Sequence, residues 1–186
     1  MDNGLNLFEN IQFSDILAHL NKGVLFRSRW QLSVSEGEKE LERILEEYHT
    51  GQLVIKGVCK IITNEKKGYF AVTVGSSGHE KALEIYKMDR YFDYFLFNGL
   101  LSELAEAAAE WIDQFIRLEL GIDKSSRISP GYPLWPDITD QEKLLKMLTA
   151  EKIGISLTEA YQLVPEHSIT GMVVENKNLE KIKLNG

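Results

Sequence analysis

The chain has few of the residues that build several common kinds of site. Cysteine occurs once in 186 residues, at Cys59, which excludes an internal disulfide and a cysteine-rich metal site. The net charge of −7 disfavours non-specific binding to nucleic acid or to a membrane surface. No run of about 18 apolar residues predicts a membrane span. Residues 1–4 lack the features of a signal peptide, so we expect a cytoplasmic protein by default.

Catalytic motifs are also missing. The sequence contains no nucleophile elbow, no P-loop and no zinc-binding helix. The four histidines are scattered, and none has a second ligand at metal-binding spacing, so we expect neither a metal site nor a self-contained catalytic site. With 44% hydrophobic residues, the chain can still bury the core of one domain, which we take as residues 1–186.

Hydrophobic periodicity predicts an α/β (α+β) domain. A short helix or a turn is expected over residues 11–21. Helices are expected over residues 36–49, 79–120 (one short and one long helix), 141–150 and from Ser156 or Thr158 to near Pro165. Strands are expected over residues 24–32, 53–62, 69–74 and 168–174, with the second and third forming a hairpin. Cys59 falls in one of these strands, where we expect an inert buried thiol. Residues 175–186 are polar and are expected to fray.

Helix ends are predicted from capping residues. Ser35 is expected to cap the helix over 36–49, and Thr139 or Asp140 the helix over 141–150. Gly121 is expected to end the long helix. The Gly-Ser-Ser-Gly turn at 75–78 can present amides to a phosphate, although we favour an ordinary loop and cap.

The long helix is predicted to have one buried face and an acidic flank. Residues at spacings of three and four share the buried face: Leu100, Leu104, Ala107, Trp111, Phe115 and Leu118. The flank carries Glu103, Glu106 and Glu110. The small residues 107–109 admit a close neighbour, which is either another helix or a ligand beside Glu106.

Residues 127–136 form the most informative segment, because they contain three of the four prolines. Proline removes a backbone donor, so this stretch is neither helix interior nor central strand. Gly131 can adopt positive φ, Arg127 can hold a carboxylate in a bidentate fork, and Tyr132 can stack on a flat ring. The loop is therefore either a rigid turn or a shelf for a small anionic or heteroaromatic ligand.

The loop and its surroundings resemble the activation domain of cobalamin-dependent methionine synthase. The motif Arg-Ile-Ser-Pro-Gly-Tyr-Pro at 127–133 follows Leu-Ala-Glu-Ala-Ala-Ala-Glu at 104–110 and precedes Ser-Ile-Thr-Gly at 168–171. The matched part runs from 91 to 174, whereas residues 1–90 match loosely. The resemblance implies a hook-shaped single domain with a small antiparallel sheet flanked by helices.

The resemblance also implies a function. In that family the domain binds S-adenosylmethionine, a flavodoxin-type protein supplies an electron to cob(II)alamin, and the methyl group of S-adenosylmethionine restores methylcobalamin. This chain contains no Asp-x-His-x-x-Gly corrinoid pattern. Cobalamin is therefore expected only through a partner, which is a corrinoid protein or a truncated methionine synthase on which this chain acts in trans.

The roles of individual residues follow from the same resemblance. The residues implied to contact S-adenosylmethionine are Glu106, Arg127, Ser129 and Gly131, with Arg127 on the carboxylate. Tyr132 and Pro133 are implied to face the corrin.

Three positions depart from the family pattern. Ile138 stands where the family has a histidine, and residues 175–179 lack its pair of tyrosines. For the family's N-terminal aspartate, Asp15 is the candidate. These departures leave two other hypotheses open. One is a non-catalytic module that docks on a corrinoid protein without using S-adenosylmethionine. The other is an enzyme or ligand-binding protein of another class, in which the acidic flank holds a metal or a cation.

Overall fold

A five-stranded antiparallel sheet forms the centre of the computed structural model, which describes residues 4–176. The spatial order of its strands is β1-β2-β3-β7-β4. The strands are β1 (Leu5–Ile11), β2 (Ile55–Ile62), β3 (Lys67–Thr73), β4 (Ser125–Ile128) and β7 (Ser168–Glu175). The predicted β2–β3 hairpin and the last strand are confirmed, whereas the edge strands β1 and β4 were not predicted.

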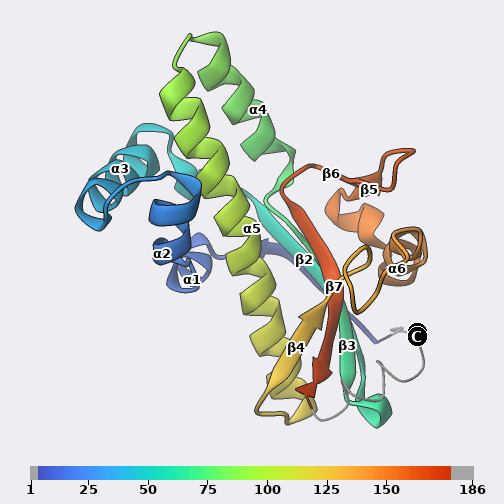
Figure 1. Cartoon of the computed structure of the whole chain (residues 1–186). Helices are drawn as coiled ribbons and strands as arrows, with labels where there is room; N and C mark the ends of the chain where they lie inside the picture. Colours follow the sequence, from blue (N-terminus) through green and yellow to red (C-terminus); the bar gives the residue numbers. More distant parts are fainter. Residues whose placement is uncertain (1–3, 177–186) are drawn as a thin grey trace.

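Helices cover both faces of the sheet (Figure 1). The α-helices are α1 (Phe13–Ala18), α2 (Lys22–Val24), α3 (Val34–Glu47), α4 (Gly75–Lys87), α5 (Tyr91–Leu120) and α6 (Asp140–Leu148). Shorter turns are the π-helix η1 (Leu25–Arg29) and the 3-10 helices η2 (Thr50–Gln52), η3 (Thr63–Glu65) and η4 (Ala150–Ile153). In Figure 1, α4 and the first half of α5 project beyond the sheet. This arrangement confirms the predicted fold class.

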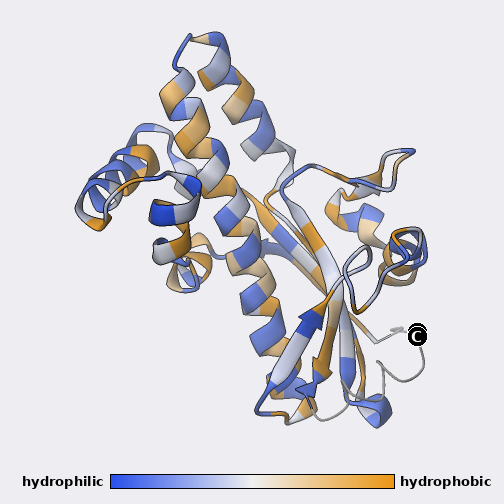
Figure 2. Cartoon of the chain, in the orientation of Figure 1, coloured by the Kyte–Doolittle hydropathy of each residue, from blue (hydrophilic) through white to orange (hydrophobic). Residues whose placement is uncertain are grey.

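The alternation of side chains along the strands creates two cores. On one face, Cys59 and Phe70 pack with α5 and the N-terminal helices. On the other face, the neighbouring residues Val58 and Ala71 pack against α6 and η4. Successive residues of a strand point to opposite faces, so one pair of central strands contributes to both cores. Burial raises the pKa of the Cys59 thiol to about 12, as suits an inert buried cysteine. In Figure 2, hydrophobic and hydrophilic residues also alternate along the helices.

The long helix α5 is the central support of the fold. It has 30 residues, which corresponds to a length of about 45 Å. The prediction of one short and one long helix is confirmed, and Gly121 ends α5 with φ of 60° as expected. The prediction of a single buried face was wrong in detail. Leu118 is 74% exposed, because the last turn of α5 lies at the edge of the packed layers.

The segment 24–32 was predicted to be extended, but its residues 24–29 are helical. The side chain of Asn21 accepts a hydrogen bond from the Val24 N–H and so begins α2, which continues into η1. Trp30 then donates its indole N–H to the Leu96 carbonyl oxygen at 2.8 Å. This contact to α5 explains why the local pattern was misread, since a tertiary partner outweighs a weak extended propensity.

Several predicted caps and ends also differ. Ser33, not Ser35, caps α3, because its hydroxyl accepts from the Glu36 N–H and Glu36 reciprocates in a capping box. Thr139 occupies the N-cap position of α6 without a side-chain cap bond, and it is held by Asp137 instead. Residues 75–78 form the first turn of α4, an ordinary helix start.

The helix predicted from Ser156 or Thr158 is instead a small hairpin of β5 (Ser156–Leu157) and β6 (Leu163–Val164). The Thr158 N–H donates to the Gln162 carbonyl oxygen at 2.9 Å and closes the loop. Residues 177–186, most of the segment expected to fray, lie outside the described residues.

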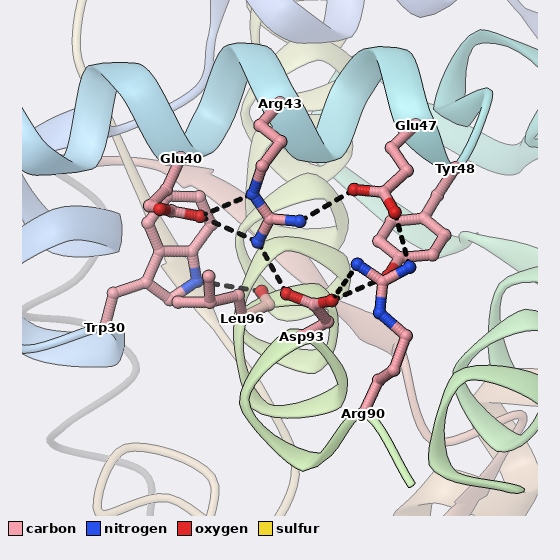
Figure 3. A network of polar contacts seen from close by, with 8 residues as sticks. All are labelled: Trp30, Glu40, Arg43, Glu47, Tyr48, Arg90, Asp93 and Leu96. Atoms are coloured by element: carbon pink, nitrogen blue, oxygen red, sulfur yellow. Dashed lines mark hydrogen bonds and ion pairs between the residues drawn. The ribbon is translucent and has the colours of Figure 1, made fainter. Parts of the chain in front are cut away.

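A polar network joins α3 to α5 (Figure 3). Arg43 contacts Asp93 through Nη2 and Oδ1 at 2.5 Å, and the Tyr48 hydroxyl donates to Asp93 Oδ2 at 2.9 Å. Arg90 binds both Glu47 and Asp93. Burial alone raises the pKa of the Asp93 carboxyl, but its hydrogen bonds with Arg43 and Tyr48 outweigh burial, and the pKa falls below the usual value. The network stabilises the N-terminal helices against α5.

Candidate functional site

A cavity of about 590 Å³ lies between the proline loop, β7 and α5. Its volume falls within the range of about 300–1,000 Å³ that is typical of small-molecule sites. Five of the six predicted site residues line it, namely Glu106, Arg127, Ser129, Tyr132 and Pro133. Gly131, the sixth, is not among the residues that line this cavity. We call this space the first cavity.

The proline loop is a closed turn that is tied to its neighbours. Gly131 has φ of 87°, and its N–H donates to the Trp135 carbonyl oxygen at 2.8 Å. The Ser129 hydroxyl donates to the Thr170 carbonyl oxygen of β7 at 2.7 Å. The Trp135 indole donates to Asp140 of α6 at 2.8 Å. The loop is therefore held in one shape by the sheet and by α6, as a binding shelf requires.

Arg127 lies beside two glutamates of α5. Its Nη2 is 3.5 Å from Glu106 Oε2 and 3.7 Å from Glu110 Oε2. Both separations are too long for strong hydrogen bonds, and within residues 4–176 the guanidinium of Arg127 donates none. Its donors are therefore available to an incoming carboxylate, for which a planar guanidinium fork is well suited.

A second cavity, of about 460 Å³, lies on the other side of Arg127. It shares Glu106 and Arg127 with the first cavity and adds Asn21 and Arg29 from the N-terminal helices. The sequence analysis did not predict that either residue belongs to the site. Asp15, the predicted N-terminal acid, lies exposed on α1 and lines neither cavity. The polar side chains that the N-terminal part brings to the second cavity are those of His19, Asn21 and Arg29.

The three glutamates of α5 do not share one environment. Glu103 is 3% exposed and accepts a hydrogen bond from the Arg29 Nε at 2.9 Å, whereas half of the Glu106 side chain is exposed. The small residues Ala107 and Ala108 both pack in the core, and Ala107 also lines the second cavity. Among residues 4–176, no group of three potential metal ligands comes together. No helix in the described part of the chain is long and apolar enough to cross a membrane.

The far side of the proline loop opens on a third space, of about 860 Å³. The loop residues Pro130 and Tyr132 line this space as well as the first cavity. Its other walls include His79 at the start of α4 and Tyr161 on the β5–β6 hairpin. Tyr132 is 66% exposed, so its ring stands between two cavities and is open to solvent.

His167 is a buried ionisable residue that directly precedes β7. Burial lowers its pKa below the usual value, the negative charge of Glu166 opposes the shift, and His79 and Arg29 add to it. The ring is therefore neutral at neutral pH.

Comparisons with known proteins fit this arrangement. Residues 57–184 match the family described as vitamin B12 dependent methionine synthase, activation domain. The chain belongs to this family. The methionine synthase of Mycobacterium tuberculosis is 29% identical over 56% of this chain and 11% of its own length. That of Mycobacterium leprae is 28% identical over 56% of this chain and 10% of its own length. The chain therefore spans only a small part of these relatives.

A solved structure shows the same fold. The crystal structure of the MetH reactivation domain bound to AdoHcy superposes with a TM-score of 0.76 at 16% identity, covering 92% of this chain and 78% of that one. The fold that the sequence resemblance implied is thereby confirmed.

Proposed function

We propose that this activation domain binds S-adenosylmethionine in the groove formed by the first and second cavities and presents its methyl group to the reduced cobalt of a corrinoid protein. The observation that carries the proposal is the position of Arg127. It lies where the two cavities meet, next to Glu106, and its hydrogen-bond donors are free. The class of ligand is suggested by the solved structure of the same fold, which is bound to AdoHcy.

The residues present suit S-adenosylmethionine. Phe70, Pro130 and Leu134 give the first cavity apolar walls on which a flat purine can pack. Arg127 is the proposed partner of the carboxylate, and Glu106 of a positive group or of the ribose hydroxyls. The proposed backbone contacts are at Ser129 and Gly131. Because the Gly131 N–H already donates to Trp135, the carbonyl oxygen is the atom of Gly131 left for a ligand.

The proposed corrin-facing residues are Tyr132 and Pro133. The exposed ring of Tyr132 at the tip of the loop offers a flat apolar surface to a macrocycle. Cobalamin stays with the partner, a corrinoid protein or a truncated methionine synthase, and the electron comes from a flavodoxin-type protein. A cytoplasmic location is part of the same proposal.

The chemistry asks little of the protein beyond binding and orientation. A sulfonium supplies an activated methyl group, and its transfer to a reduced metal centre requires no proton. Holding the donor at a fixed place lowers the entropic cost of the encounter. This agrees with a site that consists of binding groups. A docking module that does not use S-adenosylmethionine is not favoured, because it leaves the free donors of Arg127 beside Glu106 without a role.

Calorimetry with S-adenosylmethionine tests the proposal. We expect wild-type protein to bind and Arg127→Ala to lose about 10- to 100-fold in affinity, since hydrogen bonds to a charged group are each worth about 1.5–3 kcal/mol. Arg27→Ala, at an exposed position outside both cavities, is the control and should bind as the wild type does. If the wild type does not bind S-adenosylmethionine, the proposal is wrong.

A further inference from the structure

The second cavity contains an arginine to which the proposed function has so far given no role. Arg29 extends from η1 and donates through Nε to Oε1 of Glu103 on α5. The side chain of Glu103 is 3% exposed, whereas that of Arg29 is 44% exposed. Within residues 4–176, the Nη1 and Nη2 atoms of Arg29 have no hydrogen-bond acceptor. A buried acid therefore fixes one edge of a guanidinium whose other edge is free to bind a ligand.

Arg29 and Arg127 approach this cavity from two different sides. Arg29 lies on η1 and Arg127 on β4, and both line the second cavity together with Glu106 and Glu110 of α5. In Figure 1, the N-terminal helices and β4 lie on different sides of α5. The two arginines and three glutamates that line the cavity give a formal charge of −1. This charge complements S-adenosylmethionine, which carries one carboxylate and two positive groups.

The two cavities differ in the chemistry of their walls. Apolar side chains such as Phe70 and Ile128 contribute to the first cavity. Charged and amide side chains dominate the second, where Val24 and Ala107 are the apolar members. A purine is best accommodated by apolar walls, and a zwitterion requires paired charges, because a buried unpaired charge is costly. The amino-acid end of the ligand therefore belongs in the second cavity and the adenosine end in the first.

We propose that Arg29 is a specificity-determining residue of the groove. It binds the carboxylate of the amino-acid end from the side opposite Arg127, and the buried Glu103 orients it as a positioning residue. The inference rests on the proposed function and adds selectivity to it. The groove prefers adenosine compounds that keep the amino-acid end over those that lack it.

The competing explanation is structural, namely that the Arg29–Glu103 pair only ties η1 to α5. Removing Arg29 leaves the buried Glu103 carboxylate without its partner, so Arg29→Gln can lower stability as well. The double variant Arg29→Gln/Glu103→Gln removes both charges and restores a neutral contact. Arg29→Lys keeps the charge but not the fork, and Arg27→Gln is an exposed control on the same π-helical segment.

The experiment is calorimetric titration of these variants with S-adenosylhomocysteine and with 5′-methylthioadenosine, which lacks the amino-acid end. We expect Arg29→Gln and the double variant to lose at least about 10-fold in affinity for S-adenosylhomocysteine, the factor that corresponds to about 1.4 kcal/mol. Their affinity for 5′-methylthioadenosine should stay within about twofold, because each uncharged contact there is unchanged. Arg29→Lys should recover part of the loss, and Arg27→Gln should match the wild type.

Two results overturn the inference while leaving the proposed function intact. In one, Arg29→Gln binds S-adenosylhomocysteine as tightly as the wild type. In the other, the double variant loses affinity for both compounds by the same factor, which is the result of a purely structural role. If wild-type protein binds neither compound nor S-adenosylmethionine, the proposed function itself fails, and the inference fails with it.

Discussion

Replacing Gly131 by alanine should damage the proline loop in a way that the structure allows to be estimated. Gly131 has φ of 87°, a conformation that costs a residue with a Cβ about 1–2 kcal/mol. The added Cβ would also lie 2.8 Å from Cδ1 of Ile138, which is tighter than a normal contact. Because that atom is the end of a flexible side chain, we expect Ile138 to move and the steric part to be small.

The expected total is a loss of about 1–2 kcal/mol in the free energy of unfolding, which lowers the melting temperature by about 2–8 °C for a domain of this size. Affinity for S-adenosylmethionine should fall as well, because the proposed site residues Ser129 and Tyr132 lie within two positions of the altered residue. Gly131→Ala/Ile138→Ala relieves the contact but keeps the backbone strain, so it should not restore the wild-type melting temperature.

Gly154→Ala is the matched control. Gly154 has φ of 83°, and a Cβ there meets no atom within 4 Å. It should show a similar loss of stability and unchanged affinity for the ligand. Thermal denaturation and calorimetry measure both quantities for each variant. If Gly131→Ala melts and binds as the wild type does, the loop does not depend on its left-handed turn, and our reasoning about the shelf is refuted.

Three further predictions concern stability and its dependence on pH. Asp93→Asn should lower the free energy of unfolding. The loss should be smaller than the roughly 3–5 kcal/mol that follows from breaking a fully buried ion pair, because the Arg43 side chain is 34% exposed. Equal denaturant midpoints for variant and wild type would contradict this prediction. His167 has a lowered pKa in the folded state, so below the usual pKa of about 6.5 the unfolded chain takes up its proton first, and stability falls with falling pH. His167→Gln should flatten this decline in melting temperature over about pH 5–8, and an unchanged slope would speak against it. Gly171→Ala should weaken both folding and ligand binding. The added Cβ would lie 2.7 Å from the Ile128 carbonyl oxygen and would push β4, which carries Arg127, away from β7. Normal ligand affinity in a folded variant would contradict this prediction.

The central part of the fold could be predicted from the sequence because its signals are local. Most residues of β2 and β3 are apolar, a polar turn joins the two strands, and both lie in the middle of the sheet. The edge strands β1 and β4 are mixed in polarity and pair on one side only, so their patterns are weak. The helical conformation of residues 24–29 could not be predicted because the main anchor of this segment, the hydrogen bond from Trp30 to Leu96, joins residues far apart in the chain.

In the candidate site too, residues with a local sequence signal could be predicted, and residues placed by long-range contacts could not. The loop at 127–133 and Glu106 could be found because the motif is contiguous and the glutamate lies on a helix of regular pattern. Arg29 and Asn21 could not, because their relation to α5 exists only after folding. The sequence placed Glu103 on the same acidic flank as Glu106 and Glu110, and its burial could not be predicted because its partner, Arg29, is 74 residues away. Charge pairs of this kind leave no periodic signal in the sequence.

The most direct test of the account is the transfer of the methyl group itself. S-adenosylmethionine labelled in its methyl group is incubated with this protein, a corrinoid partner poised in the cob(II)alamin state and a flavodoxin-type reductant, and label on the corrinoid is measured. Our account predicts labelled methylcobalamin that depends on this chain and is lost with Arg127→Ala. Equal labelling of the corrinoid with and without this protein, using a partner that accepts methyl groups, would contradict the central claim.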